Sequence, residues 1–374
     1  MVDRWVIIKN SVPRNIPIVI IDLISSYARE FANKSHILTS IENSKYNAQR
    51  MSVFCITILS DDLVVVGLSH GSMKIINIKN GECVHTFQDF YNWNVLSIAI
   101  FSKTLTPGLI ISGSGNGALK IRNSGSGKCI KTIINAHDDA IKCIHVIPDK
   151  NVIITGSHDA TIKIWTDPSI YPSVGQRLPG NAMVDKRSPG DVITNQLTEF
   201  NINKITVVAI LEGHRRKVNC IAVLQSKHHI VSGSDDNTLK IWNIDTYTCE
   251  KTLQLDGMAI QCISLNHCGQ IVSGSRGGNI IICDPLQKYS HAVYTVKNDS
   301  IKCVDVLFDG SVVIDSENCE LKILDLSQKT KNKTKLKHSS DYVLHPLDYV
   351  LCTTPLPDGR VIGGTSYGLI KMWK

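Results

Sequence analysis

Two stretches of the chain each combine a hydroxyl, an imidazole and a carboxylate, which are the side chains of a nucleophilic hydrolase. In such an enzyme the histidine takes a proton from the hydroxyl, and the acid orients the imidazole. A tryptophan follows the acid in both stretches. The two sets are His137, Thr155, Asp159 and Trp165 in the first stretch, and His214, Ser232, Asp236 and Trp242 in the second. Whether either hydroxyl can act as a nucleophile depends on the elements that hold it.

Ser232, Asp236 and Trp242 of the second set lie in a segment that the chain repeats. Ile230–Trp242 reads IVSGSDDNTLKIW, and Ile153–Trp165 reads IITGSHDATIKIW. The further copies, which diverge to different degrees, are Leu63–Ile76, Ile110–Arg122, Ile271–Cys283, Val312–Leu324 and Val361–Trp373. Each copy has β-forming residues on both sides of a turn, which predicts two strands. One more strand is predicted before most copies and another after several, so four strands make a unit of about 40 residues.

This repeat resembles that of the WD40 family of β-propellers, and the resemblance covers the chain from about Ser35 to the C-terminus. It implies an all-β, seven-bladed propeller over residues 35–374, similar to divergent WD-repeat proteins of protists and large DNA viruses. The last copy ends at Lys374, one strand short of a blade. His36–Ser40 (HILTS) aligns with the outer strands of other copies. We expect this strand to complete the last blade and so to remove a sheet edge.

The resemblance also implies that the two polar sets are structural. In the family such a tetrad is hydrogen-bonded within one blade: the aspartate orients the histidine, the histidine meets the hydroxyl, and the hydroxyl reaches the indole N–H. A hydroxyl bound in this way is not available to a substrate, so we expect no catalytic residue and no enzyme activity. A propeller hydrolase stays the alternative if Ser232 is exposed beside an unpaired histidine. The other five blades lack the full tetrad, and we expect apolar packing to hold them.

The composition and the cysteines exclude other classes. The net charge of +7 is spread along 374 residues and does not by itself indicate nucleic-acid binding. No apolar run suits a membrane helix, and the N-terminus lacks the order of a signal peptide. Nine of the twelve cysteines fall at two equivalent positions of the repeat, and no C-x-x-C pair occurs. We therefore expect no disulfide, no metal and no cofactor, and a reducing intracellular compartment, cytoplasmic or nuclear.

By the resemblance, the loops before the inner strands and the Asp-bearing turns share one face, where partners commonly dock. The candidate partner-binding residues on this face are Arg50, Trp93, Arg215, Arg216, Lys217, Arg276 and Tyr349. Guanidinium groups pair well with carboxylates and phosphates, so this basic group suggests an acidic or phosphorylated peptide. We therefore predict a non-catalytic protein-interaction scaffold, either monomeric or a subunit of a larger complex.

Three segments depart from the repeat and leave alternatives open. Residues 1–34 carry apolar side chains at helical spacing, which predicts an amphipathic helix and faintly resembles the F-box of ubiquitin-ligase substrate receptors. A substrate receptor that docks an adaptor through this segment is one alternative. Lys329–Lys337 alternates lysine with other residues, so an RNA-binding scaffold is another, although no aromatic residues interleave. Residues 167–203 are rich in Pro and Gly, and we expect a mobile insertion loop in blade three.

Overall fold

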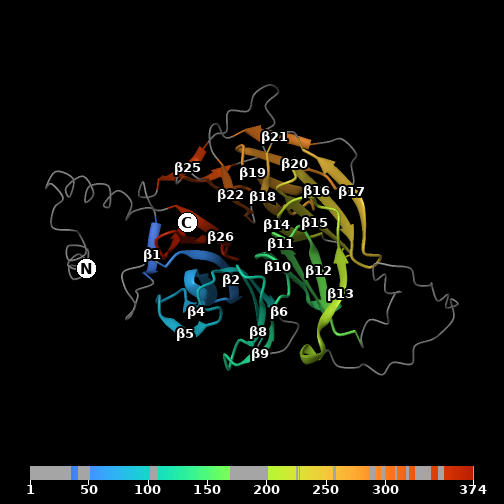
Figure 1. The fold of residues 1–374 in the computed structure, drawn as a ribbon. Coiled ribbons are helices and arrows are strands. Elements are labelled where there is room, and N and C mark those ends of the chain that lie inside the picture. Colours follow the sequence, from blue (N-terminus) through green and yellow to red (C-terminus); the bar gives the residue numbers. More distant parts are fainter. Residues whose placement is uncertain are drawn as a thin grey trace.

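The chain is almost entirely β-structure in its computed structural model (Figure 1). The structure describes the chain except residues 1–34, 41–50, 102–107, 169–200, 225, 227, 256–257, 286–290, 296–299, 308–309, 317–319, 325–337, 344–348 and 374. Over the described residues it forms seven four-stranded antiparallel sheets and three short 3-10 helices, η1 (Ser69–Gly71), η2 (Pro148–Lys150) and η3 (Ile202–Lys204). Each sheet is one blade of a propeller, and the blades are numbered here in chain order.

Blades one to six each consist of four consecutive strands. Blades one to three contain β2 (Val53–Ser60), β3 (Leu63–Leu68), β4 (Ser72–Asn77) and β5 (Cys83–Gln88); β6 (Val95–Phe101), β7 (Leu109–Ser114), β8 (Leu119–Asn123) and β9 (Cys129–Ile133); and β10 (Ile141–Ile147), β11 (Val152–Ser157), β12 (Ile162–Thr166) and β13 (Thr206–Leu211). Blades four to six contain β14 (Val218–Val223), β15 (His229–Ser234), β16 (Thr238–Asn243) and β17 (Thr248–Gln254); β18 (Ile260–Leu265), β19 (Ile271–Ser275), β20 (Asn279–Cys283) and β21 (His291–Thr295); and β22 (Ile301–Val306), β23 (Val312–Ser316), β24 (Glu320–Leu324) and β25 (His338–Val343). Blade seven contains β26 (Val350–Pro355), β27 (Val361–Thr365), β28 (Leu369–Trp373) and β1 (Ser35–Ser40).

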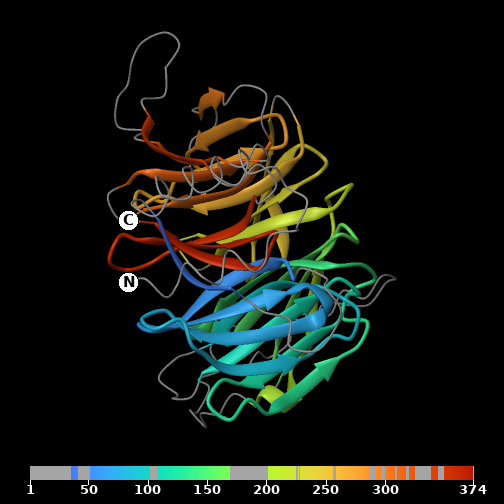
Figure 2. The same ribbon diagram turned by 90° about the vertical axis from the view of Figure 1, so that its left-hand side faces the viewer.

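Blade seven joins strands from opposite ends of the chain. β1 pairs antiparallel with β28, with Ser35 opposite Trp373 and Ser40 opposite Leu369. The predicted completion of the last blade by His36–Ser40 is thereby confirmed. The innermost strands of successive blades contact one another in turn, from β2 through β6, β10, β14, β18 and β22 to β26, and β26 contacts β2. The blades therefore close into a ring, with blue β1 beside the red strands of blade seven in Figures 1 and 2.

The second strand of each blade forms much of the core. Every residue of β11 is buried, whereas most residues of the outer strand β17 are exposed. A second strand has a sheet neighbour on each side and another blade against each face, so its sequence runs apolar or small without alternation. Apolar clusters fill the space between blades; Ile154 of blade three and Trp242 of blade four belong to one such cluster. The blades are thus held together by side chains from their central strands.

Each innermost strand begins with an irregularity that links it to the preceding blade. In β10 the register shifts between Ile141 and Cys143, and a corresponding shift recurs in the other innermost strands. Such a bulge leaves a backbone group unpaired within its own sheet. Ser97 Oγ of blade two donates to the Ile141 carbonyl at 3.1 Å. Gly113 must be a glycine here, because an added Cβ would lie 2.6 Å from the Ile141 side chain.

Cysteines occupy the position of Ser97 in the six other blades. Cys55 Sγ lies 3.5 Å from the Val95 carbonyl of the next blade, and Cys352 Sγ lies 3.7 Å from the Val53 carbonyl. Burial raises the pKa of the Cys143 thiol to about 12, so this thiol stays protonated at neutral pH. All eleven cysteines of the described residues are free. The cysteines of the innermost strands act as small interior side chains with a weak donor.

Several predictions concern residues outside the part that the structure describes. These are the helix and extension of residues 1–34, Arg50, most of the insertion (169–200) and the whole Lys329–Lys337 segment. In the remainder, no helix is both long and apolar enough to cross a membrane.

Candidate functional site

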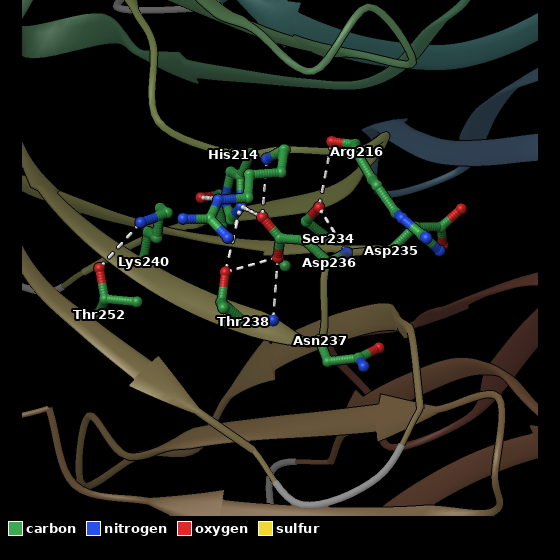
Figure 3. A network of polar contacts seen from close by, with 12 residues as sticks. His214, Arg216, Ser234, Asp235, Asp236, Asn237, Thr238, Lys240 and Thr252 are labelled. Carbon is green, nitrogen blue, oxygen red and sulfur yellow. Dashed lines mark hydrogen bonds and ion pairs between the residues drawn. The ribbon is translucent and has the colours of Figure 1, made fainter.

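The tetrad of blade four brings side chains from a loop, a turn and two strands into contact. His214 lies in the loop before β14, and its Nδ1 is 2.9 Å from Asp236 Oδ2 in the turn between β15 and β16. His214 Nε2 lies 2.7 Å from Ser232 Oγ of β15, and Trp242 Nε1 of β16 donates to the same oxygen at 2.8 Å. Thr238 Oγ1 donates to the second oxygen of Asp236 at 2.6 Å, as Figure 3 shows.

Blade three repeats this arrangement. His137 Nδ1 lies 2.7 Å from Asp159 Oδ2, and its Nε2 lies 2.7 Å from Thr155 Oγ1. Trp165 Nε1 donates to Thr155 Oγ1 at 2.9 Å, and Thr161 Oγ1 donates to Asp159 Oδ1 at 2.7 Å. The structure thus brings the eight tetrad residues of the sequence analysis together in two sets of four.

The direction of each hydrogen bond follows from what its partner can do. An ionised carboxylate only accepts, so Nδ1 of each histidine is the donor to its aspartate. Nε2 then accepts from the hydroxyl, whose oxygen accepts from the indole. Burial lowers the pKa of His214, so its imidazole is neutral at neutral pH. Burial alone would raise the pKa of Asp236, but hydrogen bonds from Thr238 and from the Arg215 N–H outweigh this and lower it to about 2.

The order aspartate, histidine, hydroxyl matches a catalytic triad, yet this arrangement cannot attack a substrate. Ser232 and Thr155 are both 0 % exposed, and each hydroxyl donates to a histidine and accepts from an indole of its own blade. A nucleophile must reach the substrate's reacting atom. The hydrolase interpretation of Ser232 is therefore wrong, because it required an exposed hydroxyl beside an unpaired histidine.

The tetrad of blade four also fixes the loop that carries exposed cations. Asp236 Oδ2 accepts from the Arg215 N–H at 3.0 Å, and Ser234 Oγ donates to the Arg216 carbonyl at 3.1 Å. The Lys217 carbonyl accepts from another N–H of the same turn at 3.0 Å. Figure 3 shows this loop above the turn between β15 and β16. Three consecutive residues thus have a fixed backbone, while their side chains are exposed.

Blade three holds the corresponding loop in the same way but with the opposite charge. The Asp138 N–H donates to Asp159 Oδ2 at 3.1 Å, and Ser157 Oγ donates to the Asp139 carbonyl at 3.0 Å. Asp138 and Asp139 are exposed and stand where blade four has two arginines. The loops of neighbouring blades therefore form an acidic segment beside a basic one.

The other rim candidates are also accessible. Trp93 is 51 % exposed, Tyr349 is 39 % exposed, and Arg276 is exposed in the turn between β19 and β20. Tyr91 and Met258, 78 % and 56 % exposed, lie on loops of the same face and were not predicted. Both loops precede an inner strand, so loop position was the signal that could have found them. Within the described part of the chain, no set of three or more His, Cys, Asp or Glu side chains is arranged to hold a metal.

Blade two replaces the tetrad with a buried salt bridge. Arg122 of β8 stands in the tryptophan position, and its Nε donates to Asp89 Oδ1 at 2.7 Å. The Asp89 side chain is fully buried, and Lys120 Nζ lies 3.6 Å from the same oxygen. Burial would lower the pKa of Arg122, but the hydrogen bond to Asp89 outweighs this and raises it. Blade two thus adds a buried salt bridge to the expected apolar packing, in which Ile111, Leu119 and Ile121 are fully buried.

Blades two and seven are among those that keep a single member of the tetrad without its partners. Ser112 of blade two aligns with Ser232 and is 0 % exposed, but its Oγ has no hydrogen-bond partner among the described residues. Blade seven keeps Trp373, and its indole lies directly against Gly363. A Cβ added to Gly363 would lie only 2.7 Å from the indole ring. The indole therefore packs over a glycine in place of a hydroxyl.

Known proteins share this repeat and this fold. The sequence profile of the WD40 family, described as "WD domain, G-beta repeat", matches residues 127–166 and 205–243, which contain both tetrads. The ribosome biogenesis protein WDR12 homolog of Aedes aegypti is 31 % identical over 125 residues, 29 % of this chain and 28 % of that protein. The U3 small nucleolar RNA-associated protein 12 of Saccharomyces cerevisiae is 29 % identical over 202 residues, 53 % of this chain and 18 % of that protein.

The matched part spans less than a third of the length of each of these two relatives. Among solved structures, the WD40 β-propeller domain of Doa1 superposes with a TM-score of 0.66 at 17 % sequence identity. That match covers 91 % of this chain and 96 % of the other, and at this identity it shows the fold alone.

Proposed function

We propose that this chain, a β-propeller with WD40 repeats, is a non-catalytic scaffold that binds a protein partner on the face formed by the loops before its inner strands. The observation that carries the proposal is the basic loop of Arg215, Arg216 and Lys217, whose backbone is fixed and whose side chains are exposed. A preorganised loop loses little conformational entropy on binding, which favours affinity. The two tetrads support a scaffold over an enzyme, because their hydroxyls are buried and hydrogen-bonded.

The chemistry of this face favours an acidic or phosphorylated segment. No ion pair joins Arg215, Arg216, Lys217 or Arg276 to another residue that the structure describes. Binding a partner therefore does not require these cations to break an ion pair with a described residue. Guanidinium groups form strong paired hydrogen bonds with carboxylates and phosphates. The acidic loop of blade three repels such a segment and so fixes its position over blades four and five. Exposed aromatic residues on the same face offer apolar contacts.

The proposal is tested by reversing one charge on each face. Cross-linking mass spectrometry from native cells identifies the partner, and its affinity is then measured for Lys217→Glu and Lys128→Glu. Lys128 is the matched control, because it is an exposed lysine in the turn between β8 and β9, at the opposite face. We expect Lys217→Glu to weaken binding about tenfold, which corresponds to about 1.4 kcal/mol, and Lys128→Glu to leave it unchanged. Equal effects of the two variants, or cross-links confined to the opposite face, would refute the proposal.

Two alternatives depend on segments outside the described residues. A ubiquitin-ligase substrate receptor requires residues 1–34 to dock an adaptor, which a pull-down with and without this segment tests. An RNA-binding scaffold requires Lys329–Lys337, and the relative named for a small nucleolar RNA keeps it as the second candidate. RNA binding that weakens steeply with salt and depends on these lysines would favour it. The free thiols of the described cysteines support an intracellular location for any of these functions.

A further inference from the structure

A short turn of blade two lies between an exposed tryptophan and the acidic loop of blade three. This turn, Gly115–Gly117, connects β7 and β8. A Cβ added to Gly115 would lie 3.6 Å from the indole of Trp93, and a Cβ added to Gly117 would lie 3.0 Å from the Asp139 carbonyl. Backbone hydrogen bonds of 3.0 Å join the turn to the loop of Trp93 on one side and to the acidic loop on the other. The turn therefore holds the two loops next to each other.

Little side-chain material separates the indole from the acidic loop. Two of the three residues of the turn are glycines, and the side-chain oxygen of the third, Asn116, accepts from the Ala118 N–H of the same turn at 3.2 Å. Three consecutive residues span at most about 7 Å from the first Cα to the last. An extended peptide advances about 3.3–3.6 Å per residue. Two residues of a partner that stand two or three positions apart can therefore contact the indole and the acidic loop together.

The indole and the acidic loop attract the same kind of charge. Trp93 is 51 % exposed, whereas the other three tryptophans of the described chain are at most 3 % exposed. Indole is the aromatic ring that binds cations best, and it prefers them over its face. Asp138 and Asp139 are exposed, and neither is joined by an ion pair to another described residue. This surface therefore favours a cationic ligand and repels an acidic one.

We propose that this surface, formed by Trp93, Asp138 and Asp139, binds a basic segment of a protein partner. One arginine or lysine lies on the indole, and a second pairs with the carboxylates. The proposal goes beyond the basic loop of blade four, because it assigns the opposite ligand chemistry to another part of the same face. A partner with a basic segment next to an acidic one is then oriented on the face by both loops.

Two synthetic peptides of equal length test the proposal on the full chain. One alternates arginine with glycine, and the other alternates glutamate with glycine. We expect the arginine peptide to shift the indole N–H resonance of Trp93 in a nuclear magnetic resonance titration, whereas the glutamate peptide should not. The resonance is assigned by its absence in Trp93→Phe. Isothermal titration calorimetry gives the affinity of the arginine peptide.

Three variants measure what each part of the surface contributes. Trp93→Ala removes the cation–π contact and should weaken the arginine peptide about fivefold, and Asp138→Lys should weaken it about tenfold. Asp138→Lys keeps the backbone N–H that donates to Asp159, so the loop stays fixed. Glu82→Lys is the matched control, because it makes the same charge reversal in an exposed turn between β4 and β5, at the opposite face. It should leave the affinity unchanged.

The basic loop is tested separately. Lys217→Glu should weaken the partner identified by cross-linking but not the arginine peptide, so a failure of the basic loop is told apart from a failure of this surface. An arginine peptide that does not bind up to about 1 mM overturns the proposal. Binding that Trp93→Ala and Asp138→Lys leave unchanged overturns it too, as does an equal loss in Glu82→Lys. A Trp93 resonance that the glutamate peptide shifts as strongly overturns the assigned charge.

Discussion

Ser232 and Ser112 allow the role of the tetrad to be measured with one substitution at two equivalent positions. Both serines are 0 % exposed, and each lies opposite a lysine on the next strand of its blade. Ser232 Oγ bonds His214 and Trp242, whereas Ser112 Oγ has no partner among the described residues. Changing either serine to alanine removes one oxygen from a buried site. The difference between the two variants therefore isolates the hydrogen bonds.

The magnitude follows from the groups that each change leaves behind. Ser232→Ala leaves the indole N–H of Trp242 and Nε2 of His214 buried without their partner. Each unsatisfied buried group costs about 1–3 kcal/mol, so the free energy of unfolding should fall by about 2–6 kcal/mol. Ser112→Ala removes a buried oxygen that gains nothing in the folded state. It should leave the stability unchanged or raise it by about 1 kcal/mol.

Urea unfolding of the two variants and the wild type, followed by circular dichroism, measures the difference. An indole N–H resonance of Trp242 that shifts in Ser232→Ala but not in Ser112→Ala reports the broken bond directly. If both substitutions change the free energy of unfolding equally within about 0.5 kcal/mol, the tetrad contributes no net stability and the reasoning fails.

Two further predictions concern buried charges. Asp89→Asn leaves Arg122 without its carboxylate and should lower the free energy of unfolding by about 3 kcal/mol; a double-mutant cycle with Arg122→Met measures the coupling, and additive effects would contradict the pairing. Burial between blades six and seven raises the pKa of Asp305 to about 7, against opposing hydrogen bonds from Thr353 and Cys303. The folded state then holds this proton more tightly than the unfolded state, whose pKa is about 3.9, so this group's contribution to stability falls by up to about 4 kcal/mol from about pH 4 to about pH 7. Asp305→Asn should remove that fall in urea unfolding at several pH values, and identical pH profiles in both proteins would exclude it.

The sequence predicts most where the repeat fixes the geometry. His214, Ser232, Asp236 and Trp242 recur in blade three at matching positions of the repeat, so residues distant in sequence could be placed in one blade before any coordinates. The closing strand His36–Ser40 was predictable for the same reason, because the last copy lacks an outer strand.

The salt bridge of blade two shows where such prediction ends. Asp89 and Arg122 are 33 positions apart, and Asp89 comes from a loop whose length and sequence vary between copies. Arg122 marked only a missing tryptophan, because periodicity identifies the position of a side chain but not a partner on an irregular loop. Tyr91 was missed in the same way. It lies four positions before its inner strand, as His214 does, yet it points to solvent while Asp89 is buried.

The distribution of tetrads among the blades relates the architecture to the proposed function. The two blades with a complete tetrad are those whose loops before the inner strand carry consecutive charges, acidic in blade three and basic in blade four. In both, the aspartate that orients the histidine also accepts the N–H of the first charged residue, so one carboxylate serves the core and the rim together. A cluster of like charges repels itself and favours an open, mobile loop. The tetrad aspartate counters that tendency, because it accepts a hydrogen bond from the loop and is itself held by a buried histidine. This explains why the strongest polar network underlies the most highly charged part of the face.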